Sequence, residues 1–479
     1  MPESWATFGT DLHLELNGAG VRSGLITALR DAVRSGRLAS GTRLPSSRSL
    51  AADLGIARNT VADAYSELVA EGWLTARQGS GTRVAGRAEP RAAAPGPPRT
   101  RPTPRRPAYS LMPGAPDHSQ FPRKQWLAAA RRALTAAPDE AFACAEALGR
   151  IELRTAIADY LARVRGVYAI PERVVICSGF HHGLMLLAQV LAARRVRGVA
   201  VESYGLDVHR RQLHAAGLRT RPLGVDALGT RTDELTGLDG VGAVLMTPSH
   251  QFPLGLALHP DRRAAAVGWA RRTGGLIVED DYDGEFRYDR QPVGALQGLD
   301  PDRVVYLGTA SKSLATGLRL AWMVVPEDLI ADIVLAKWDG DWMSSTLDQL
   351  TLAEFITSGA YERHVRAMRL RYRRRRDQLV SALAEHAPEI RVTGIAAGLH
   401  AVLELPPGTE RSVVEAAARQ GLAVSGMARF RYGAGAPGGS RSGLAHRALP
   451  EKDALVVGYG TPSDSAWSGA LDTLCRILP

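Results

Sequence analysis

The chain of 479 residues is long enough for about three domains of ordinary size, which excludes a single small binding module. Hydrophobic residues make up 45% and charged residues 23%, as in ordinary globular proteins, and no apolar run approaches the roughly 18 residues of a membrane span. The start of the chain lacks an export signal, and three cysteines cannot form a disulfide framework or a spaced metal site. We therefore expect a cytoplasmic protein with no metal site and no membrane partner.

The net charge of +10 is concentrated near the amino terminus. Residues 1–110 hold 15 arginines against nine acidic residues, so more than half of the excess lies in under a quarter of the chain. A basic amino-terminal segment followed by a near-neutral remainder suggests a polyanion-binding module joined to a domain of another kind. An arginine bias that reflects genome composition is the alternative.

The first segment has the pattern of a small helical domain that ends in a hairpin. Apolar residues at three- and four-residue spacing predict helices, and a serine cap and a glycine stop bound the second one. A glycine-rich turn separates two short strands. The predicted helices and strands cover residues 21–35, 46–55, 58–71, 73–76 and 82–84. Together they predict a winged helix-turn-helix domain over residues 1–84.

A proline- and arginine-rich segment follows at residues 85–110. Seven prolines lie between Pro90 and Pro107, and the remaining residues are mostly small or charged, so the segment cannot bury a core. We expect a semi-stiff linker here, joined to a body over residues 111–479.

The body alternates short apolar runs with helical stretches. The runs are rich in β-branched residues and lack alternation, as expected for strands that are covered on both faces. They lie at residues 174–177, 199–202, 243–246, 276–278, 304–307 and 321–325. This pattern predicts an α/β doubly wound sheet over about 150–325, followed by a smaller part over about 329–479. The run of four arginines at 373–376 is expected on the solvated face of a long helix, with a second DNA site as the alternative.

The predicted helix-turn-helix has side chains suited to DNA. Its second helix would lie in the major groove, where arginine can bond guanine and asparagine can bond adenine. A small helical domain that binds a protein is the alternative. The residues that we expect to contact DNA are Arg43, Ser46, Ser47, Arg48, Arg58, Asn59, Thr60, Arg77, Gly79, Ser80 and Gly81.

Three stretches of this domain closely resemble the winged helix of the GntR family. They are GTRLPSSR at 41–48, ARNTV at 57–61 and EGWL at 71–74. The resemblance covers residues 37–84 and implies binding to double-stranded operator DNA.

Polar residues stand at the carboxyl ends of the predicted strands, where ligands bind in open α/β sheets. A lysine, a carboxylate, hydroxyls and an arginine beside a helix amino terminus are the groups that pyridoxal phosphate requires. Each alone is a weak signal, because Lys312 can be an ordinary surface lysine and the acidic stretch 279–285 a solvated loop.

The order of the motifs decides between these interpretations. TPSHQFPLG at 247–255, EDDYDGEF at 279–286 and GTASKS at 308–313 resemble the MocR (GabR-like) regulators, which join a GntR winged helix to a fold-type I aminotransferase-like domain. The resemblance spans nearly all of the chain. It implies a mostly parallel sheet with a smaller α+β subdomain, the cofactor pyridoxal phosphate, and a homodimer that is head-to-tail.

The same resemblance implies roles for individual residues. It places a Schiff base at Lys312, a pyridinium partner at Asp280 and a ring-oxygen contact at Tyr282. The implied phosphate contacts are Ser178, Gly179, Phe180, Thr309, Ser311 and Arg319.

Two positions depart from the pattern of ordinary aminotransferases, and a third matches a position of the family. Phe252 stands where those enzymes have an asparagine for the ring oxygen, so Gln251 or His250 must substitute if anything does. The stretch 202–206 ends in Leu206, where related proteins often have a tyrosine. We take Tyr204 as the residue that stacks on the cofactor ring. Arg429 matches a position that some family members use to bind a carboxylate, with a surface arginine as the alternative.

We therefore expect a DNA-binding transcription regulator that senses a small amine, an amino acid or pyridoxal phosphate itself through an aldimine at Lys312. One alternative is a catalytically active aminotransferase with an accessory DNA-binding domain. The other is a body that has lost the cofactor and serves only as a dimer scaffold.

Overall fold

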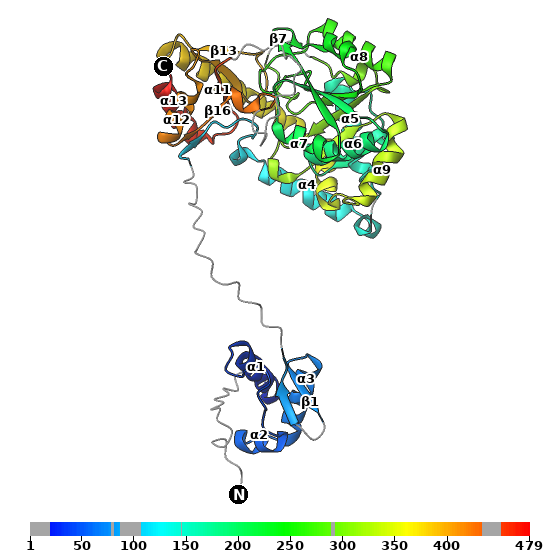
Figure 1. The fold of residues 1–479 in the computed structure, drawn as a ribbon, viewed down its shortest axis with the longest axis vertical. Coiled ribbons are helices and arrows are strands. Elements are labelled where there is room, and N and C mark those ends of the chain that lie inside the picture. The colour runs from blue at the N-terminus through cyan, green and yellow to red at the C-terminus, as the bar shows by residue number, and fades with distance from the viewer. Residues whose placement is uncertain (1–19, 78–80, 87–106, 145, 289–292, 434–451) are drawn as a thin grey trace. The chain divides into compact units, whose positions relative to one another are not determined.

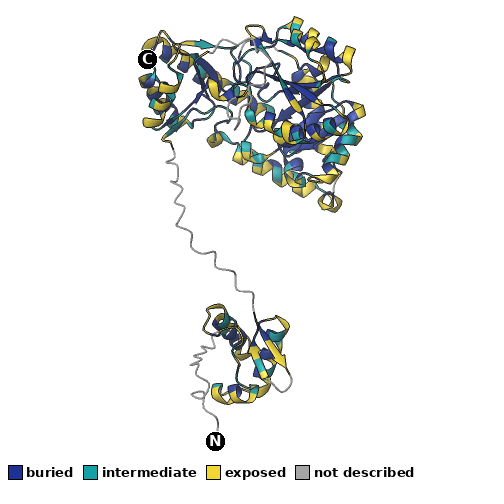
Figure 2. Cartoon of the chain, viewed as in Figure 1, coloured by how far each residue is buried: buried dark blue, intermediate teal, exposed yellow. Residues whose placement is uncertain are grey.

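The computed structural model describes residues 20–77, 81–86, 107–144, 146–288, 293–433 and 452–479. The chain divides into two compact units, Met1–Pro104 and Arg105–Pro479. Figure 1 shows the elements of each unit, and Figure 2 shows that the buried residues gather inside each of them. None of the described helices is long and apolar enough to cross a membrane.

The first unit holds three helices and a two-stranded hairpin. Its elements are α1 (Val21–Arg34), α2 (Ser47–Leu54), α3 (Arg58–Ala70), β1 (Leu74–Arg77) and β2 (Gly81–Val84). The apolar stripes of the helices meet in a core that includes Leu25, Leu50 and Val61. The side chain of Ser46 caps α2 by accepting the N–H of Ser49 at 3.1 Å, and Gly55 ends that helix in the left-handed region. These elements confirm the winged helix-turn-helix expected from the sequence.

A seven-stranded sheet organises the body. Its strand order is β4, β12, β11, β10, β9, β5, β6, and all strands run parallel except β12. The bounds are β4 (Val174–Cys177), β5 (Gly198–Glu202), β6 (Arg219–Leu223), β9 (Val241–Met246), β10 (Leu276–Asp280), β11 (Val304–Thr309) and β12 (Ala321–Val324). The sheet confirms the expected α/β class. Of its seven strands only β6 was not expected, because this edge strand contains arginines and a proline that obscure its pattern.

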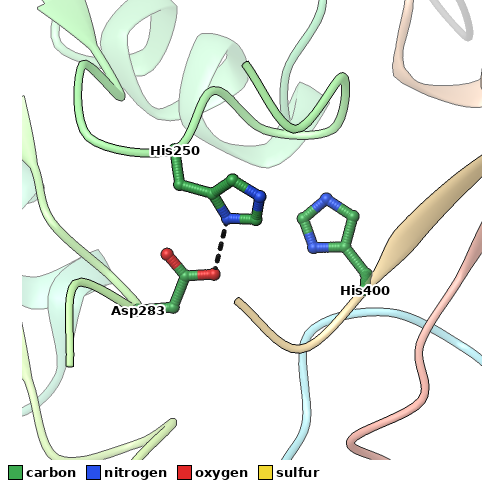
Figure 3. Close-up of side chains that lie close together, drawn as sticks. All are labelled: His250, Asp283 and His400. Carbon is green, nitrogen blue, oxygen red and sulfur yellow. Dashed lines mark hydrogen bonds and ion pairs between the residues drawn. The ribbon is translucent and has the colours of Figure 1, made fainter. Parts of the chain in front are cut away.

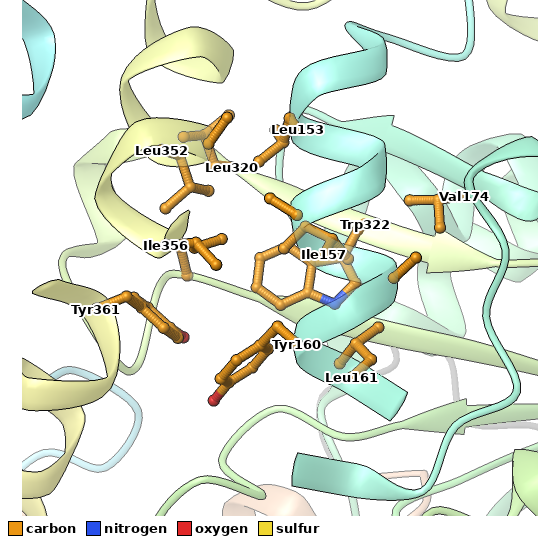
Figure 4. Packing of buried hydrophobic residues seen from close by; sticks show 14 of the residues in the cluster. Leu153, Ile157, Tyr160, Leu161, Val174, Leu320, Trp322, Leu352, Ile356 and Tyr361 are labelled. Atoms are coloured by element: carbon orange, nitrogen blue, oxygen red, sulfur yellow. The ribbon is translucent and has the colours of Figure 1, made fainter. Parts of the chain in front are cut away.

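Helices cover both faces of this sheet, which explains why its strands are continuously apolar. Val174 and Ile176 pack with α4 (Arg123–Ala136), α5 (Ile151–Arg165) and α10 (Thr346–Thr357), in the cluster of Figure 4. Val175 and Cys177 point to the opposite face. The helices that complete the covering are α6 (Phe180–Ala193), α7 (Asp207–Ala215), α8 (Pro260–Thr273) and α9 (Ile330–Asp339), and a small hairpin pairs β7 (Val225–Asp226) with β8 (Gly229–Thr230).

The smaller part is built on a four-stranded antiparallel sheet in the order β13, β14, β17, β16. Its elements are β13 (Arg391–Thr393), β14 (Ala401–Glu404), β16 (Ser425–Gly426), β17 (Ala454–Val457), α11 (Ala360–His386), α12 (Glu410–Arg419) and α13 (Asp464–Ile477). The expected start at residue 329 is too early, because α9 and α10 pack on the large sheet. Along α11, the apolar residues up to Val365 pack in the core of the large sheet, and those from Met368 onward pack in the core of the smaller part.

The expected linker also differs at its carboxyl end. Tyr109 and Ser110 form β3 (Tyr109–Ser110), which pairs in parallel with β15 (Leu422–Ala423). These two residues therefore belong to the body. Most of the expected linker, residues 87–106, lies outside the described residues.

The arginine run on α11 is not uniformly solvated. Arg373 and Arg374 are exposed, but Arg375 is 3% exposed and donates to Asp117 at 3.0 Å and to Asp464 at 2.7 Å. Helical geometry turns one residue of any run of four toward the interior, and two carboxylates compensate its charge there. The expected solvated face therefore holds for two of these arginines and not for the third.

Candidate functional site

A pocket of about 440 Å³ opens at the carboxyl ends of β5, β9, β10 and β11. The sheet topology explains its position, since Asp280 ends β10 and Thr309 ends the neighbouring strand β11. The expected site residues that line it are Phe180, Tyr204, Asp280, Tyr282, Thr309, Ser311, Lys312, Arg319 and Arg429. The body thus brings together residues that lie up to about 250 positions apart in the chain.

Lys312 and Asp280 give the pocket its charged centre. The Lys312 amine donates to the carbonyl of Gly114. Burial lowers the pKa of Lys312, against the opposing effect of the Asp280 and Asp283 carboxylates. Burial also raises the pKa of Asp280 well above its ordinary value, and the charge of Lys312 opposes that rise. Asp280 Oδ1 is buried and has no hydrogen-bond partner among the described residues, so the carboxylate is suited to a ligand that carries an N–H group.

An anion cup lies at the amino terminus of α6. Gly179 precedes the helix with φ 95°, and a Cβ atom on it would lie 2.3 Å from Arg319 Nη2, so a larger residue would strain the backbone and displace the guanidinium. Arg319 donates to the carbonyl of Ser178 at 2.7 Å and itself has a left-handed φ of 53°. A helix amino terminus that carries an arginine matches the requirements of a phosphate group.

His182 supports this cup by a hydrogen bond to the backbone of Ser178, a role that was not expected from the sequence. Its Nδ1 accepts the N–H of Ser178 at 3.0 Å, while its Nε2 lies 3.4 Å from Asp341. The position four residues after Ser178, one turn along α6, is the signal that could have identified it.

Two aromatic side chains after β5, those of Tyr204 and His209, line the pocket where a ligand ring could stack. Tyr204 lines the pocket, but it also packs with Met427 and Phe430 in a cluster of the smaller part. His209 lines the pocket too, and its ring lies 4.7 Å from that of Phe180 at 38°. Burial, followed by the charges of His181, Lys312 and Arg210, lowers the pKa of His209 to about 3. His209 was not among the expected site residues, although it follows the carboxyl end of β5.

Phe252 and Gln251 lie in the loop after β9, where ordinary aminotransferases have the asparagine that binds the ring oxygen. Phe252 lines the pocket. The Gln251 amide donates to the carbonyls of Tyr204 and Phe252, at 3.1 and 2.7 Å, and its oxygen accepts the N–H of Leu254 at 3.1 Å. The hydrogen-bonding groups of Gln251 are therefore used within the protein. His250 does not line the pocket and contacts the hydroxyl of Tyr282.

Arg429 borders the pocket from the smaller part. It lies on a short turn, η9 (Met427–Phe430), and its side chain is exposed. Glu410 holds that turn by accepting the N–H groups of Ala428 at 3.0 Å and Ala454 at 3.2 Å. The arginine is thus placed at the pocket mouth by a fixed turn.

The first unit presents its candidate DNA contacts at the start of α3 and beside the hairpin. Arg58 and Asn59 are exposed and Thr60 is half-buried. Arg43 and Arg77 are also exposed. Gly81 begins β2 with φ 79°, and a Cβ atom on it would lie 3.2 Å from Arg43 Nε.

The remaining DNA candidates flank α2 and the wing. Ser46 caps α2, Ser47 begins it and Arg48 is exposed on its first turn. Gly79 and Ser80 lie outside the described residues.

Both units match known families. Residues 22–84 match the family described as "Bacterial regulatory proteins, gntR family", and residues 111–445 match "Aminotransferase class I and II". The chain is 33% identical to the HTH-type pyridoxine biosynthesis transcriptional regulator PdxR of Corynebacterium glutamicum, over 90% of this chain and 93% of the relative. It is also 33% identical to the probable rhizopine catabolism regulatory protein MocR of Rhizobium meliloti, over 85% of this chain and 86% of the relative.

The body is similar to solved aminotransferases. An archaeal alanine:glyoxylate aminotransferase matches 77% of this chain and 90% of its own, with a TM-score of 0.68 and 25% identity. The kynurenine aminotransferase of Pyrococcus horikoshii matches with a TM-score of 0.66 and 24% identity, which shows the fold alone. The body therefore has the fold-type I aminotransferase architecture, and this fold supports pyridoxal phosphate as the cofactor.

Proposed function

The chain belongs to the MocR-like subfamily of GntR transcription regulators, and from this premise we propose that its body holds pyridoxal phosphate on Lys312 and reports the state of that pocket to an operator. The observation that carries the proposal is the presence of Lys312 and Asp280 in the same pocket, where the buried Oδ1 of Asp280 has no hydrogen-bond partner among the described residues. A buried carboxylate in this state is costly in a protein that does not use it.

The proposal assigns each group of the cofactor to residues in or beside the pocket. We assign covalent attachment to Lys312, the ring nitrogen to Asp280, the ring oxygen to Tyr282 and ring stacking to Tyr204. When bound, pyridoxal phosphate supplies an aldehyde carbon that reacts with amines and an electron-withdrawing ring. The residues assigned to the phosphate are Ser178, Gly179, Phe180, Thr309, Ser311 and Arg319.

The effector is a small amine, an amino acid or pyridoxal phosphate itself. An amino group would compete with the Lys312 amine for the same carbon, and Arg429 would bind the carboxylate of an amino acid at the pocket mouth. An effector changes DNA binding only if it binds one arrangement of the protein better than the other. Arg429 belongs to the smaller part, so its engagement with a ligand would favour one position of that part.

The winged helix is assigned to double-stranded DNA. The first turn of α3 would read base edges through Arg58 and Asn59, with Thr60 beside them. The contacts to the DNA backbone would come from Arg43, Ser46, Ser47, Arg48, Arg77, Gly79, Ser80 and Gly81. The protein would act in the cytoplasm as a head-to-tail homodimer, which suits an operator of two half-sites.

Mass spectrometry tests the assignment of Lys312. The full-length protein is incubated with pyridoxal phosphate, reduced with borohydride and digested. The proposal expects one cofactor on the peptide that contains Lys312, and none in a Lys312→Ala variant. Lys337→Ala is not a suitable control because Lys337 is fully buried, whereas the exposed Lys452 gives a matched Lys452→Ala variant that should be labelled like the wild type. Label on another lysine would contradict the assignment.

An active aminotransferase with an accessory DNA-binding domain is the second candidate, because the solved neighbours of the body are aminotransferases. The two functions differ in turnover. Accumulation of keto acid well beyond one equivalent per protein would support the enzyme, whereas a single exchange of the bound amine without sustained product would support the sensor.

A further inference from the structure

The hydroxyl of Tyr282 is held in place by His250. Tyr282 Oη lies 3.1 Å from the His250 carbonyl oxygen, to which it donates, and 3.1 Å from His250 Nδ1. The His250 ring is fixed in turn by Asp283, whose Oδ2 lies 2.8 Å from Nδ1. Since a carboxylate can only accept, His250 Nδ1 carries the proton of that bond. His250 thus contacts the tyrosine through two atoms while Asp283 fixes its orientation.

A second histidine packs against this pair from the smaller part (Figure 3). His400 precedes β14, and its ring lies 4.9 Å from that of His250 at 35°. His400 Nε2 lies 3.0 Å from the carbonyl of Pro253, which can only accept, so the bond fixes the orientation of the ring. His250, Asp283 and His400 are 3%, 2% and 5% exposed, so water does not compete for these bonds.

The backbone at Gly398 packs tightly against this cluster. Gly398 has φ 69°, and a Cβ atom there would lie 2.3 Å from both Asp283 Oδ2 and His250 Cε1. The chain of the smaller part therefore packs directly on the pair. Burial, followed by the charge of His250, lowers the pKa of His400 to about 3, which keeps this ring neutral beside its neighbour.

Neither the basic residues of α11 nor the exposed tryptophans at and just after the carboxyl end of α9 point to a ligand or a partner. The basic residues of α11 are largely engaged by carboxylates and carbonyls, and the exposed Trp338 and Trp342 form a patch for which no contact identifies an occupant. The ligand atoms of His250, Asp283 and His400 lie within 4.8 Å of one another, a spacing that also suits a metal ion. The hydrogen bonds above account for the same geometry without an ion, so the cluster is better described as a hydrogen-bonded support.

We propose that His250, fixed by Asp283 and clamped by His400, is a positioning residue that sets the Tyr282 hydroxyl in the pocket, in a protein where Phe252 stands in place of the asparagine of ordinary aminotransferases. The proposal rests on the proposed function, because it concerns how the pocket meets pyridoxal phosphate. His250, Asp283 and His400 lie outside the pocket lining, and they would affect the affinity for the cofactor through the hydroxyl of Tyr282.

A double-mutant cycle tests the transmission. The dissociation constant of pyridoxal phosphate is measured by equilibrium dialysis for the wild type, Tyr282→Phe, His250→Leu and the double variant, all full-length. One hydrogen bond of about 1.4 kcal/mol corresponds to about a tenfold change, so Tyr282→Phe should bind about tenfold more weakly. His250→Leu removes the Nδ1 contact and keeps the backbone carbonyl, so it should bind more weakly by an amount up to that of Tyr282→Phe. The double variant should also be about tenfold weaker rather than a hundredfold, because both changes remove the same contribution. Independent effects that multiply would overturn the proposal, as would an unchanged affinity in His250→Leu.

Two further variants separate positioning from general structure. His250→Asn retains an N–H that can reach Asp283, so it should restore affinity to within about threefold of the wild type and should restore the absorbance band of the bound cofactor that His250→Leu shifts. The exposed His386 provides the control His386→Ala, which should bind like the wild type. If His250→Leu does not fold, His400→Phe replaces it in the cycle, since phenylalanine keeps a flat ring and loses only the bond to Pro253.

The outcomes distinguish this proposal from the proposed function. If Lys312→Ala abolishes covalent cofactor while the cycle is additive, only the role of His250 fails. If Lys312→Ala still carries covalent cofactor, the proposed function fails first. A stoichiometric metal ion in the purified protein that disappears in His400→Phe would also overturn the proposal, because it would make the three residues a metal site.

Discussion

Replacing Asp280 by asparagine should weaken cofactor binding while leaving the cofactor-free protein at least as stable as the wild type. Asp280 is 7% exposed, and its Oδ1 has no hydrogen-bond partner among the described residues. Burial raises its pKa, so the cofactor-free protein gains little from the charged form of this carboxyl. Asparagine has nearly the same shape and removes the charge. The free energy of unfolding of the cofactor-free variant should therefore stay equal or rise.

The expected loss of affinity follows from the type of bond that is removed. A hydrogen bond to a charged group contributes about 1.5–3 kcal/mol, which corresponds to about a 10- to 150-fold weaker binding of pyridoxal phosphate. Equilibrium dialysis measures the affinity and urea unfolding of the cofactor-free protein measures the stability. Asp239→Asn is the matched control, because Asp239 is exposed in the segment before β9 and should change neither quantity. Unchanged affinity in Asp280→Asn, or a stability lower by more than about 1 kcal/mol, would refute the reasoning.

Three more predictions concern the two units. Burial and the charge of Asp281 raise the pKa of Glu285 from an ordinary value of 4.5 to about 7. This carboxyl therefore stabilises the fold at low pH, and that stability is lost as the pH rises from 4.5 toward 7. The free energy of unfolding of Glu285→Gln should depend less steeply on pH in that range than that of the wild type, and equal slopes would contradict the assignment. Gly179→Ala strains a positive φ and displaces the Arg319 guanidinium, so pyridoxal phosphate should bind about tenfold more weakly, and unaltered binding in dialysis would show that the cup tolerates a Cβ. Asn59→Ala should relax sequence preference in a DNA-binding assay while Arg77→Ala should weaken all sequences alike, and the reverse pattern would reject these contacts.

The sequence predicts those parts of the fold that local pattern determines. The three helices and the hairpin of the first unit, and six of the seven strands of the large sheet, follow from apolar spacing, caps and β-branched runs. Parallel topology then predicts that Asp280 and Lys312 reach one crevice, because residues that follow neighbouring strands meet at the same edge of a sheet.

Contacts between distant segments are beyond such reasoning. His400 meets His250 across 150 positions of chain, and no periodicity links them. The buried Arg375 lies in the same run of arginines as the exposed Arg373 and Arg374, and the placement of Asp117 and Asp464 distinguishes it. The pairing of β3 with β15 depends likewise on where two remote segments meet. In each case the tertiary partner, rather than the local pattern, determines the outcome.

The most direct test of the account links the pocket to DNA in a single titration. A preferred DNA sequence is selected from a random pool with the full-length protein, and its dissociation constant is then measured with and without pyridoxal phosphate. Coupling between two sites typically amounts to about 1–3 kcal/mol, so the cofactor should change the affinity of the wild type by at least about fivefold and leave Lys312→Ala unaffected. Equal DNA affinity of the wild type at every cofactor concentration that fills the pocket would contradict the account.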